Sequence, residues 1–275
     1  MTQGKMSATQ LLRAGSRLSR HTAGGDKRRP YFLYVPSNCR PNSPVFIAVH
    51  GIQCDALRMA HSFVPLAERM GCLLIAPLFS RVIYFDYMRL ACDERGLRPD
   101  TALGAILEEV HALTSVTTSR YHMFGFSGGG QFVHRYMMAR PDQVERAVLA
   151  APGWYTFPDI AIPFPSGLGH IDALPDVRFN LPELLSVPVS VLVGEHDVVR
   201  DETFMTSKHL DHGQGIHRLE RAQRWVRHMS ASAHAYNLDT CYDFQVLPGV
   251  GHSFEQCMNE GGMGNAVFDF LFGGD

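Results

Sequence analysis

The sequence G-F-S-G-G, residues 125–129, decides the fold of this chain. An apolar run of strand length, 121–126, leads into it, and a helical pattern from about 129 to 140 follows. A tight turn from a strand into a helix leaves little room for side chains two positions before and two positions after its central Ser127, which explains the glycines. The pattern predicts a strand–turn–helix unit that presents the Ser127 hydroxyl group as a candidate nucleophile.

Apolar runs of strand length alternate with helical patterns on both sides of this unit. We predict further strands over 31–35, 45–49, 73–76, 147–151, 189–193 and 244–247, and helices over 60–70, 99–113, 219–235 and 264–271. Several of these strands are continuous apolar runs, so both of their faces should be covered. The pattern therefore predicts an α/β fold, with a mostly parallel central sheet and helices on both faces.

One large domain accounts for most of the 275 residues, and we assign residues 30–275 to it. Residues 1–29 hold seven of the 25 Lys and Arg side chains but one of the 27 acidic ones, which predicts a basic, partly disordered extension. The stretch 152–188 is rich in proline and aromatic residues and too long for an ordinary connection. We expect it to form a binding loop or a short, loop-rich cap.

A second motif, V-H-G-I-Q at 49–53, follows an earlier strand. If Ser127 attacks a carbonyl carbon, the resulting oxyanion needs two backbone N–H donors. We expect these donors to come from Ile52 and Gly128. His50 is expected to hold the loop through hydrogen bonds and not to act as the base. Gln53, next along the chain, is expected to contact the substrate.

Two further motifs supply an acid and a histidine after later strands. Asp197 ends V-L-V-G-E-H-D, and His252 lies in P-G-V-G-H-S-F near the C-terminus. A Ser–His–Asp triad needs a carboxylate to orient the imidazole, and the chain order Ser127, Asp197, His252 is one that such triads take. Glu195 and Asp201 are the nearby alternatives for the acid.

Together these four motifs resemble the α/β-hydrolase family over about residues 31–271. R-P-Y-F-L-Y-V-P at 29–36 and the V-H-G that directly ends its strand are similar to the esterase and polyhydroxyalkanoate-depolymerase-like branch. The resemblance implies Ser127 as the nucleophile, His252 as general base and then acid, Asp197 as its orienting partner, and an oxyanion hole from the N–H groups of Ile52 and Gly128. We expect neither a signal peptide nor a disulfide framework in this sequence, which sets it apart from secreted members of the branch.

We therefore expect a serine hydrolase that cleaves a carboxylic ester through an acyl-enzyme intermediate. Two alternatives are hydrolysis of another acyl bond (amide or peptide, thioester, or carbon–carbon) and a non-catalytic binding protein on the same fold. Trp154 and Tyr155 follow the strand after the elbow and are expected to line the substrate pocket. Further aromatic candidates are Phe79, Tyr84, Phe85, Tyr87 and Phe157, and arginines that could bind a substrate carboxylate are Arg81, Arg89 and Arg200.

The composition limits the kinds of partner and cofactor that we expect. A formal net charge of −2 gives no general argument for a nucleic acid, and no apolar run has the length of a membrane-spanning helix. The six cysteines form no C-x-x-C pair and no zinc-binding spacing, so we expect free thiols in a reducing, cytoplasmic compartment and neither a metal nor an organic cofactor. The expected partner is a small-molecule or oligomeric ester; the oligomeric state is left open.

Overall fold

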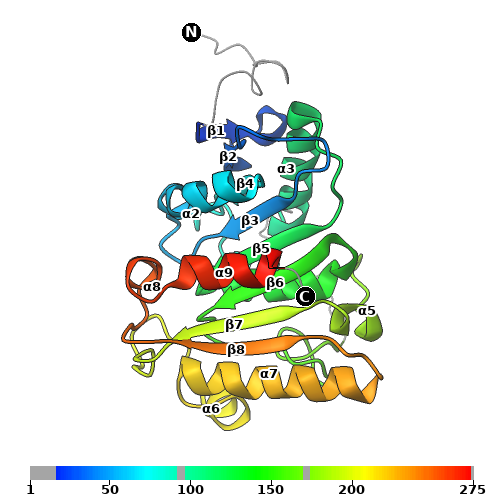
Figure 1. Cartoon of the computed structure of the whole chain (residues 1–275). Coiled ribbons are helices and arrows are strands. Elements are labelled where there is room, and N and C mark those ends of the chain that lie inside the picture. Colours follow the sequence, from blue (N-terminus) through cyan, green and yellow to red (C-terminus); the bar gives the residue numbers. More distant parts are fainter. Residues whose placement is uncertain (1–16, 92–96, 170–173, 274–275) are drawn as a thin grey trace.

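An eight-stranded sheet forms the centre of the structure, a computed structural model in which residues 17–91, 97–169 and 174–273 are described (Figure 1). Its strands are β1 (Ser19–Thr22), β2 (Pro30–Tyr34), β3 (Val45–Val49), β4 (Leu73–Pro77), β5 (Tyr121–Phe126), β6 (Val144–Ala150), β7 (Val189–Gly194) and β8 (Tyr242–Leu247). They lie in the order β1-β2-β4-β3-β5-β6-β7-β8. β2 pairs antiparallel with β1 and β4, and the other pairings are parallel. The predicted α/β-hydrolase fold is confirmed.

Helices cover both faces of the sheet, as the apolar strands predict. The longer ones are α2 (Ala56–Met70), α3 (Pro99–Thr114), α4 (Gly128–Ala139), α7 (Arg218–Ala235) and α9 (Met263–Phe272). Apolar side chains of α3, α4 and α7 form one core with one face of the sheet, and those of α2 and α9 form another core with the opposite face. In β3, Ile47 belongs to the first core and Phe46 to the second, which is the alternation expected of a strand buried on both sides.

Three short helices do not appear among the predicted elements: α5 (Leu181–Leu185), α6 (Lys208–Gly213) and α8 (Phe254–Asn259). Each begins after a residue whose side chain accepts a hydrogen bond from the N–H group three positions later, namely Asn180, Ser207 and Ser253. Such caps stabilise a helix start. With five or six residues each, these helices are too short to establish the apolar period on which the predictions depend.

The sheet starts earlier in the chain than predicted. β1 lies within the segment assigned to the basic extension, yet it pairs along its whole length with β2. The boundary predicted at residue 30 therefore moves to before Ser19. The physical reason is that a polar edge strand is held by backbone hydrogen bonds and carries no alternating apolar pattern. Residues 1–16 of the predicted extension lie outside the described residues. Among the residues described, no helix combines the length and apolar character required to span a membrane.

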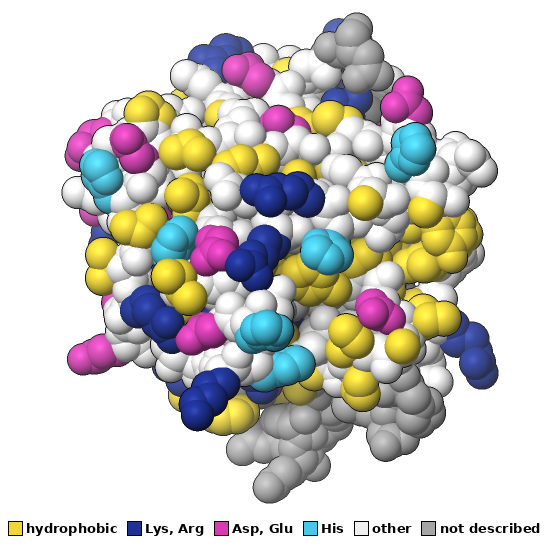
Figure 2. Space-filling model, turned by 90° about the horizontal axis from the view of Figure 1, so that it is seen from below, with side chains coloured by type: hydrophobic (Ala, Val, Ile, Leu, Met, Phe, Trp, Pro, Cys, Tyr) yellow, Lys and Arg dark blue, Asp and Glu magenta, His cyan; other side chains and the backbone are white. Residues whose placement is uncertain are grey.

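The predicted insert, 152–188, is turn-rich apart from α5, and its residues 170–173 lie outside the described part. Its middle section folds back on itself, because Phe157 N–H donates to Ser166 O at 2.9 Å and Leu168 N–H donates to Asp159 O at 2.7 Å. This section borders a cavity of about 470 Å³ against α6 and α7. The molecular face seen from below in Figure 2, toward α6 and α7, mixes basic, acidic, histidine and hydrophobic side chains.

Candidate active site

Ser127 occupies the turn between β5 and α4, where the sequence places it. Its φ of 52° is left-handed, a conformation that costs energy for any residue other than glycine. Glycines make the turn possible: a Cβ atom on Gly129 would lie 2.0 Å from Val49 O, and one on Gly125 would lie 2.2 Å from Gly129 O. The turn thus holds the Ser127 side chain at the carboxyl end of the central strands.

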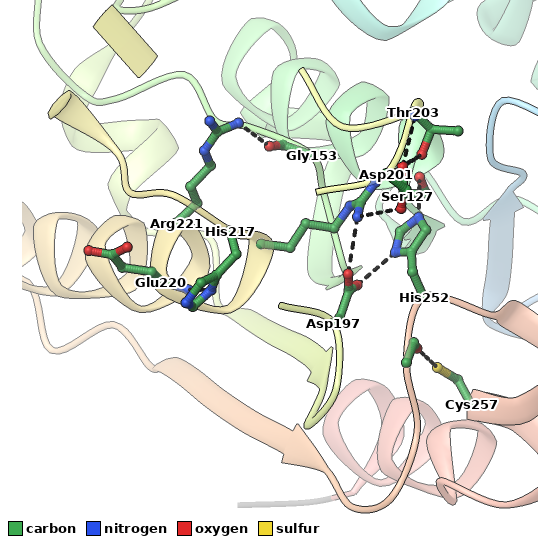
Figure 3. Close-up of polar contacts among 12 residues, drawn as sticks. Ser127, Gly153, Asp197, Asp201, Thr203, His217, Glu220, Arg221, His252 and Cys257 are labelled. Atoms are coloured by element: carbon green, nitrogen blue, oxygen red, sulfur yellow. Dashed lines mark hydrogen bonds and ion pairs between the residues drawn. The ribbon is translucent and has the colours of Figure 1, made fainter. Parts of the chain in front are cut away.

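Three side chains from separate loops converge on this turn (Figure 3). His252 Nε2 lies 3.0 Å from Ser127 Oγ, and His252 Nδ1 lies 2.7 Å from Asp197 Oδ2. Because a carboxylate only accepts hydrogen bonds, Nδ1 carries the proton and Nε2 is free to accept the proton of the Ser127 hydroxyl group. Asp197 is buried and His252 partly exposed. This is the arrangement in which a serine becomes a nucleophile.

The two alternative acids make other contacts. The Glu195 carboxylate is exposed and accepts a hydrogen bond from Gly249 N–H at 2.8 Å. Asp201 accepts hydrogen bonds from Thr203 and from an arginine, Arg218. Burial alone would raise the pKa of Asp201, but the hydrogen bonds from Thr203 and Arg218 outweigh burial and lower its pKa to about 2. Among the three candidate acids, Asp197 is the one that contacts His252.

Arg218, at the start of α7, is a site residue that the sequence analysis missed. Its Nη1 donates to Asp197 Oδ1 at 3.1 Å, which is the carboxylate oxygen that His252 leaves free. The same guanidinium group contacts Asp201 and donates to Thr203 Oγ1 at 3.0 Å. It is almost wholly buried. No local pattern distinguishes Arg218 from the other arginines of α7, so a single sequence carries no signal for its role.

The two expected oxyanion donors lie on adjacent segments. Gly128 is the first residue of α4, and the first N–H groups of a helix have no partner within the helix and carry a partial positive charge. A Cβ atom on Gly128 would lie 3.1 Å from Ile52 Cγ2, so the loop that carries Ile52 passes directly beside it. The backbone of Gly128 and the loop of Ile52 are therefore neighbours, and their role as oxyanion donors stays a prediction.

The hydrogen bonds of His50 hold its loop in place, and the residue also borders a cavity that opens at Ser127. Its Nε2 accepts a hydrogen bond from Phe79 N–H at 3.0 Å, its Nδ1 lies 2.7 Å from Gly51 O, and its carbonyl oxygen accepts from the Tyr87 hydroxyl group at 3.0 Å. Burial lowers the pKa of His50 to about 4. The imidazole is therefore neutral at pH 7 and fixes the loop that carries Ile52.

Among the residues that the structure describes, two cavities open next to Ser127, and Ile52 and Thr203 line both of them. The larger, of about 450 Å³, includes Gln53 and His252 in its wall. The smaller, of about 70 Å³, includes Trp154. Gln53 and Trp154 thus lie where a substrate would contact them. From the segment between β7 and α6, Thr203 and Met205 also contribute to these walls, and the sequence analysis missed both.

Tyr155 does not line either cavity, contrary to the sequence-based prediction. Its ring is fully buried and stacks on Trp225 with 5.0 Å between the ring centroids, and its N–H group donates to Gln214 Oε1. The aromatic ring is used to complete the core between the sheet and α7. Burial raises the pKa of Tyr155 well above its usual value.

Most of the other aromatic and arginine candidates also lie outside the site. Phe79, Tyr84 and Tyr87 are buried, Phe85 is exposed, and Phe157 borders the separate cavity against α6 and α7. Arg200 pairs with Asp211, and Arg81 lines neither cavity at Ser127. Arg89 lines the smaller cavity, with its charge paired to Asp86 at 2.9 Å.

The described cysteines are free thiols: Cys39, Cys54, Cys72, Cys241 and Cys257. Cys92 lies outside the described residues. Within the described residues, no cluster of three or more His, Cys, Asp or Glu side chains is arranged to hold a metal ion.

No protein-family model matches the chain. It is similar in structure to a poly(3-hydroxybutyrate) depolymerase from Bordetella parapertussis, with 25% identity and a TM-score of 0.77 over 98% of this chain and 95% of the other. Poly(aspartic acid) hydrolase-1 from Sphingomonas sp. KT-1 also has 25% identity, with a TM-score of 0.73 over 94% of this chain and 98% of the other.

A curated protein, the bifunctional acetylxylan esterase/xylanase XynS20E of Neocallimastix patriciarum, is 25% identical over 111 residues. The match spans 40% of this chain and 16% of the length of that relative. With the sheet order and the solved structures, these similarities show that the chain belongs to the α/β-hydrolase superfamily. Within the superfamily it falls in the esterase-like branch, among depolymerases and other hydrolases, which supports hydrolase activity.

Proposed function

We propose that this protein is a serine hydrolase that cleaves a carboxylic ester through an acyl-enzyme intermediate. The observation that carries the proposal is the continuous hydrogen-bonded chain from Ser127 through His252 to Asp197. It is buried at the acid end and opens to two cavities at the serine end. A structural role would not require a strained serine, an imidazole nitrogen 3.0 Å from its hydroxyl oxygen and an open cavity at one point.

In the proposed reaction, His252 Nε2 takes the proton from Ser127 Oγ as that oxygen attacks the carbonyl carbon. The tetrahedral oxyanion accepts hydrogen bonds from the N–H groups of Ile52 and Gly128. His252 then gives its proton to the departing alcohol, and the bond between the acyl carbon and the alcohol oxygen breaks. A water molecule repeats the sequence on the acyl-enzyme and releases the acid, while Asp197 orients the imidazole and stabilises its charged form.

Ester hydrolysis is preferred because two of the three similar proteins are named as an acetylxylan esterase and a poly(3-hydroxybutyrate) depolymerase, and amide hydrolysis is the main alternative because the third is named as a hydrolase of a polyamide, poly(aspartic acid). Cleavage of an amide, thioester or carbon–carbon bond uses the same nucleophile, and a direct comparison of substrates separates these reactions. A purely binding role is disfavoured because Ser127, His252 and Asp197 are all present and in contact.

The proposal is tested with p-nitrophenyl esters and the matching p-nitroanilides, using the Ser127→Ala protein as the control. We expect hydrolysis of the esters, little hydrolysis of the anilides, and loss of activity in Ser127→Ala. Mass spectrometry after treatment with a fluorophosphonate should locate the label on Ser127. Ester turnover that survives Ser127→Ala, or a label on a different residue, would refute the assignment of the nucleophile.

A further inference from the structure

The two cavities at Ser127 differ in size and in their contacts with the catalytic histidine. The larger, of about 450 Å³, is within the range of pockets that hold a drug-sized group, and the smaller, of about 70 Å³, is far below it. Since one water-sized group needs between about 10–15 Å³ of cavity space and the roughly 30 Å³ that a water molecule takes up in the liquid, the smaller cavity has room for only a few groups of this size. Ser127 lines both cavities, so an ester bound there can extend its acyl part into one and its alcohol part into the other.

The position of His252 decides which part enters which cavity. When the tetrahedral intermediate collapses, the departing alcohol oxygen must receive a proton from His252 Nε2. His252 lines the larger cavity and does not line the smaller one. The alcohol therefore leaves through the larger cavity. The oxyanion faces the N–H groups of Ile52 and Gly128, so the remaining substituent, the acyl chain, extends into the smaller cavity.

One side of the smaller cavity, formed by Trp154, is held firmly in place. Trp154 is 4% exposed, and the guanidinium group of Arg135 lies 4.2 Å from the centre of its ring, a favourable contact between a cation and an aromatic face. Arg135 is itself fixed, because its Nη1 donates to Met88 O at 2.7 Å and its Nε donates to Thr156 Oγ1 at 2.9 Å. The guanidinium group of Arg89 lies 5.4 Å from the ring centre. Trp154 thus has little freedom to move aside for a longer chain.

From these contacts, and resting on the proposed function, we infer that the enzyme is selective for esters of short acyl chains and accepts large alcohols. An acyl group of two to about four carbon atoms fills the smaller cavity. Trp154 sets the upper limit of its length. The alcohol side is different in character: Met59, Phe126 and Phe254 give it an apolar wall, while Arg58 with its ion-pair partners Asp55 and Glu255 gives it a charged edge.

The test varies one part of the ester at a time. With p-nitrophenol held constant, kcat/KM for the acetate to butyrate esters should exceed that for the octanoate by about 100-fold, because added methylene groups clash with a rigid wall. With acetate held constant, kcat/KM should remain high from a small alcohol to a bulky one. The opposite preferences, for octanoate over acetate or for methanol over any large alcohol, would overturn the inference.

Two variants test whether the wall of the smaller cavity limits the length of the acyl chain. Trp154→Leu and Met205→Ala both enlarge the smaller cavity. Because the side chain of Met205 is 41% exposed, its replacement should leave the fold intact even if Trp154→Leu fails to fold. Each should shift the best substrate toward longer acyl chains. Phe254→Leu, in the wall of the larger cavity, is the matched control, and it should change the preference among alcohols while leaving the acyl-chain order as it is.

The outcomes separate this inference from the proposed function. If the ranking of acyl-chain lengths by kcat/KM is unchanged in Met205→Ala and in a folded Trp154→Leu protein, the assignment of the acyl chain to the smaller cavity is refuted. That result would leave the serine hydrolase proposal standing. Conversely, if no ester is hydrolysed faster than by Ser127→Ala, the proposed function fails and the specificity inference fails with it.

Discussion

At the residue scale, the ion pair between Arg218 and Asp197 is expected to support both folding and catalysis. Both side chains are almost wholly buried, and removing one partner of such a pair leaves the other charge uncompensated. We expect Arg218→Met to lower the free energy of unfolding by about 3–5 kcal/mol. It should also lower kcat more than it changes KM, because Asp197 would no longer be held against His252. Urea unfolding and steady-state kinetics on a p-nitrophenyl ester measure both effects.

Arg224 on the same helix offers a matched control for Arg218. It pairs with Glu220 one turn away, and both side chains are about one-third exposed. Pairs of this kind contribute at most about 1 kcal/mol. Arg224→Met should therefore unfold at nearly the same urea concentration as the parent protein and retain its kcat. Equal stability and equal kcat in Arg218→Met and Arg224→Met would contradict the role assigned to Arg218.

The residues of the site divide into those that a sequence can predict and those that it cannot. Ser127, Asp197 and His252 each follow a strand within a recognisable motif, so their order and spacing predict that they meet. Arg218 comes from the start of α7 and Thr203 from the loop between β7 and α6. Contacts between distant parts of the chain bring both to the site, and such contacts leave no local pattern in the sequence. Tyr155 was misassigned for the same reason, because only packing against Trp225 decides which way its ring points.

At the element scale, the turn between β5 and α4 requires glycine at position 129 for steric reasons. A Cβ atom on Gly129 would lie 2.0 Å from the backbone oxygen of Val49, which cannot move without disturbing β3. We expect Gly129→Ala to destabilise the protein by about 1–3 kcal/mol or more. It should also displace Ser127 and abolish ester hydrolysis. Thermal unfolding and activity measurements test the expectation.

Gly104, in the interior of α3, provides the opposite case. A Cβ atom there would have no neighbour within 4 Å. Glycine costs a helix interior up to about 1 kcal/mol relative to alanine, so Gly104→Ala should raise the melting temperature with no effect on activity. If Gly129→Ala were tolerated as well as Gly104→Ala, the steric account of the turn would be wrong.

Elements were predicted well where their patterns were long. The helices α3 and α7 and the apolar strands β3, β4, β5 and β7 have enough residues to show their period, and the structure contains them within a few residues of the predicted bounds. β1 and the helices α5, α6 and α8 were not predicted. They are short or polar, and they are held by side-chain caps or by pairing with a neighbouring strand.

At the scale of the whole molecule, three neutral histidines, two of them buried and one half-buried, should make the fold sensitive to acid. Burial lowers the pKa of His50 and of His122 to about 4, and that of His134 well below its usual value. In the unfolded chain these groups titrate near 6.5. Between pH 6.5 and 4 the unfolded state therefore binds more protons, so stability is complete above pH 6.5 and falls as the pH is lowered through this window. At about 1.4 kcal/mol per pKa unit, His50 alone accounts for about 3 kcal/mol.

Urea unfolding at a series of pH values measures this loss. The free energy of unfolding should decline from pH 6.5 to pH 4, and the decline should be shallower in His50→Gln, which removes one titrating group. The stabilisation from the hydrogen-bonded carboxylate of Asp201 is fully present above about pH 4 and is lost only as the pH falls from about 4 to about 2, because its pKa is about 2 in the folded protein and close to 4 ordinarily. A flat profile between pH 6.5 and 4 would show that the three histidines are not buried as described.

The placement of the two tryptophans gives the protein a built-in optical reporter. Trp154 lines the smaller cavity, whereas Trp225 lies in the core, with its Nε1 donating to Thr156 O at 2.8 Å. In a Trp225→Phe protein, all indole fluorescence would originate beside Ser127. Loading of the serine with an acyl group would then change the emission directly, so the formation and hydrolysis of the intermediate could be followed in a stopped-flow instrument without a chromogenic substrate.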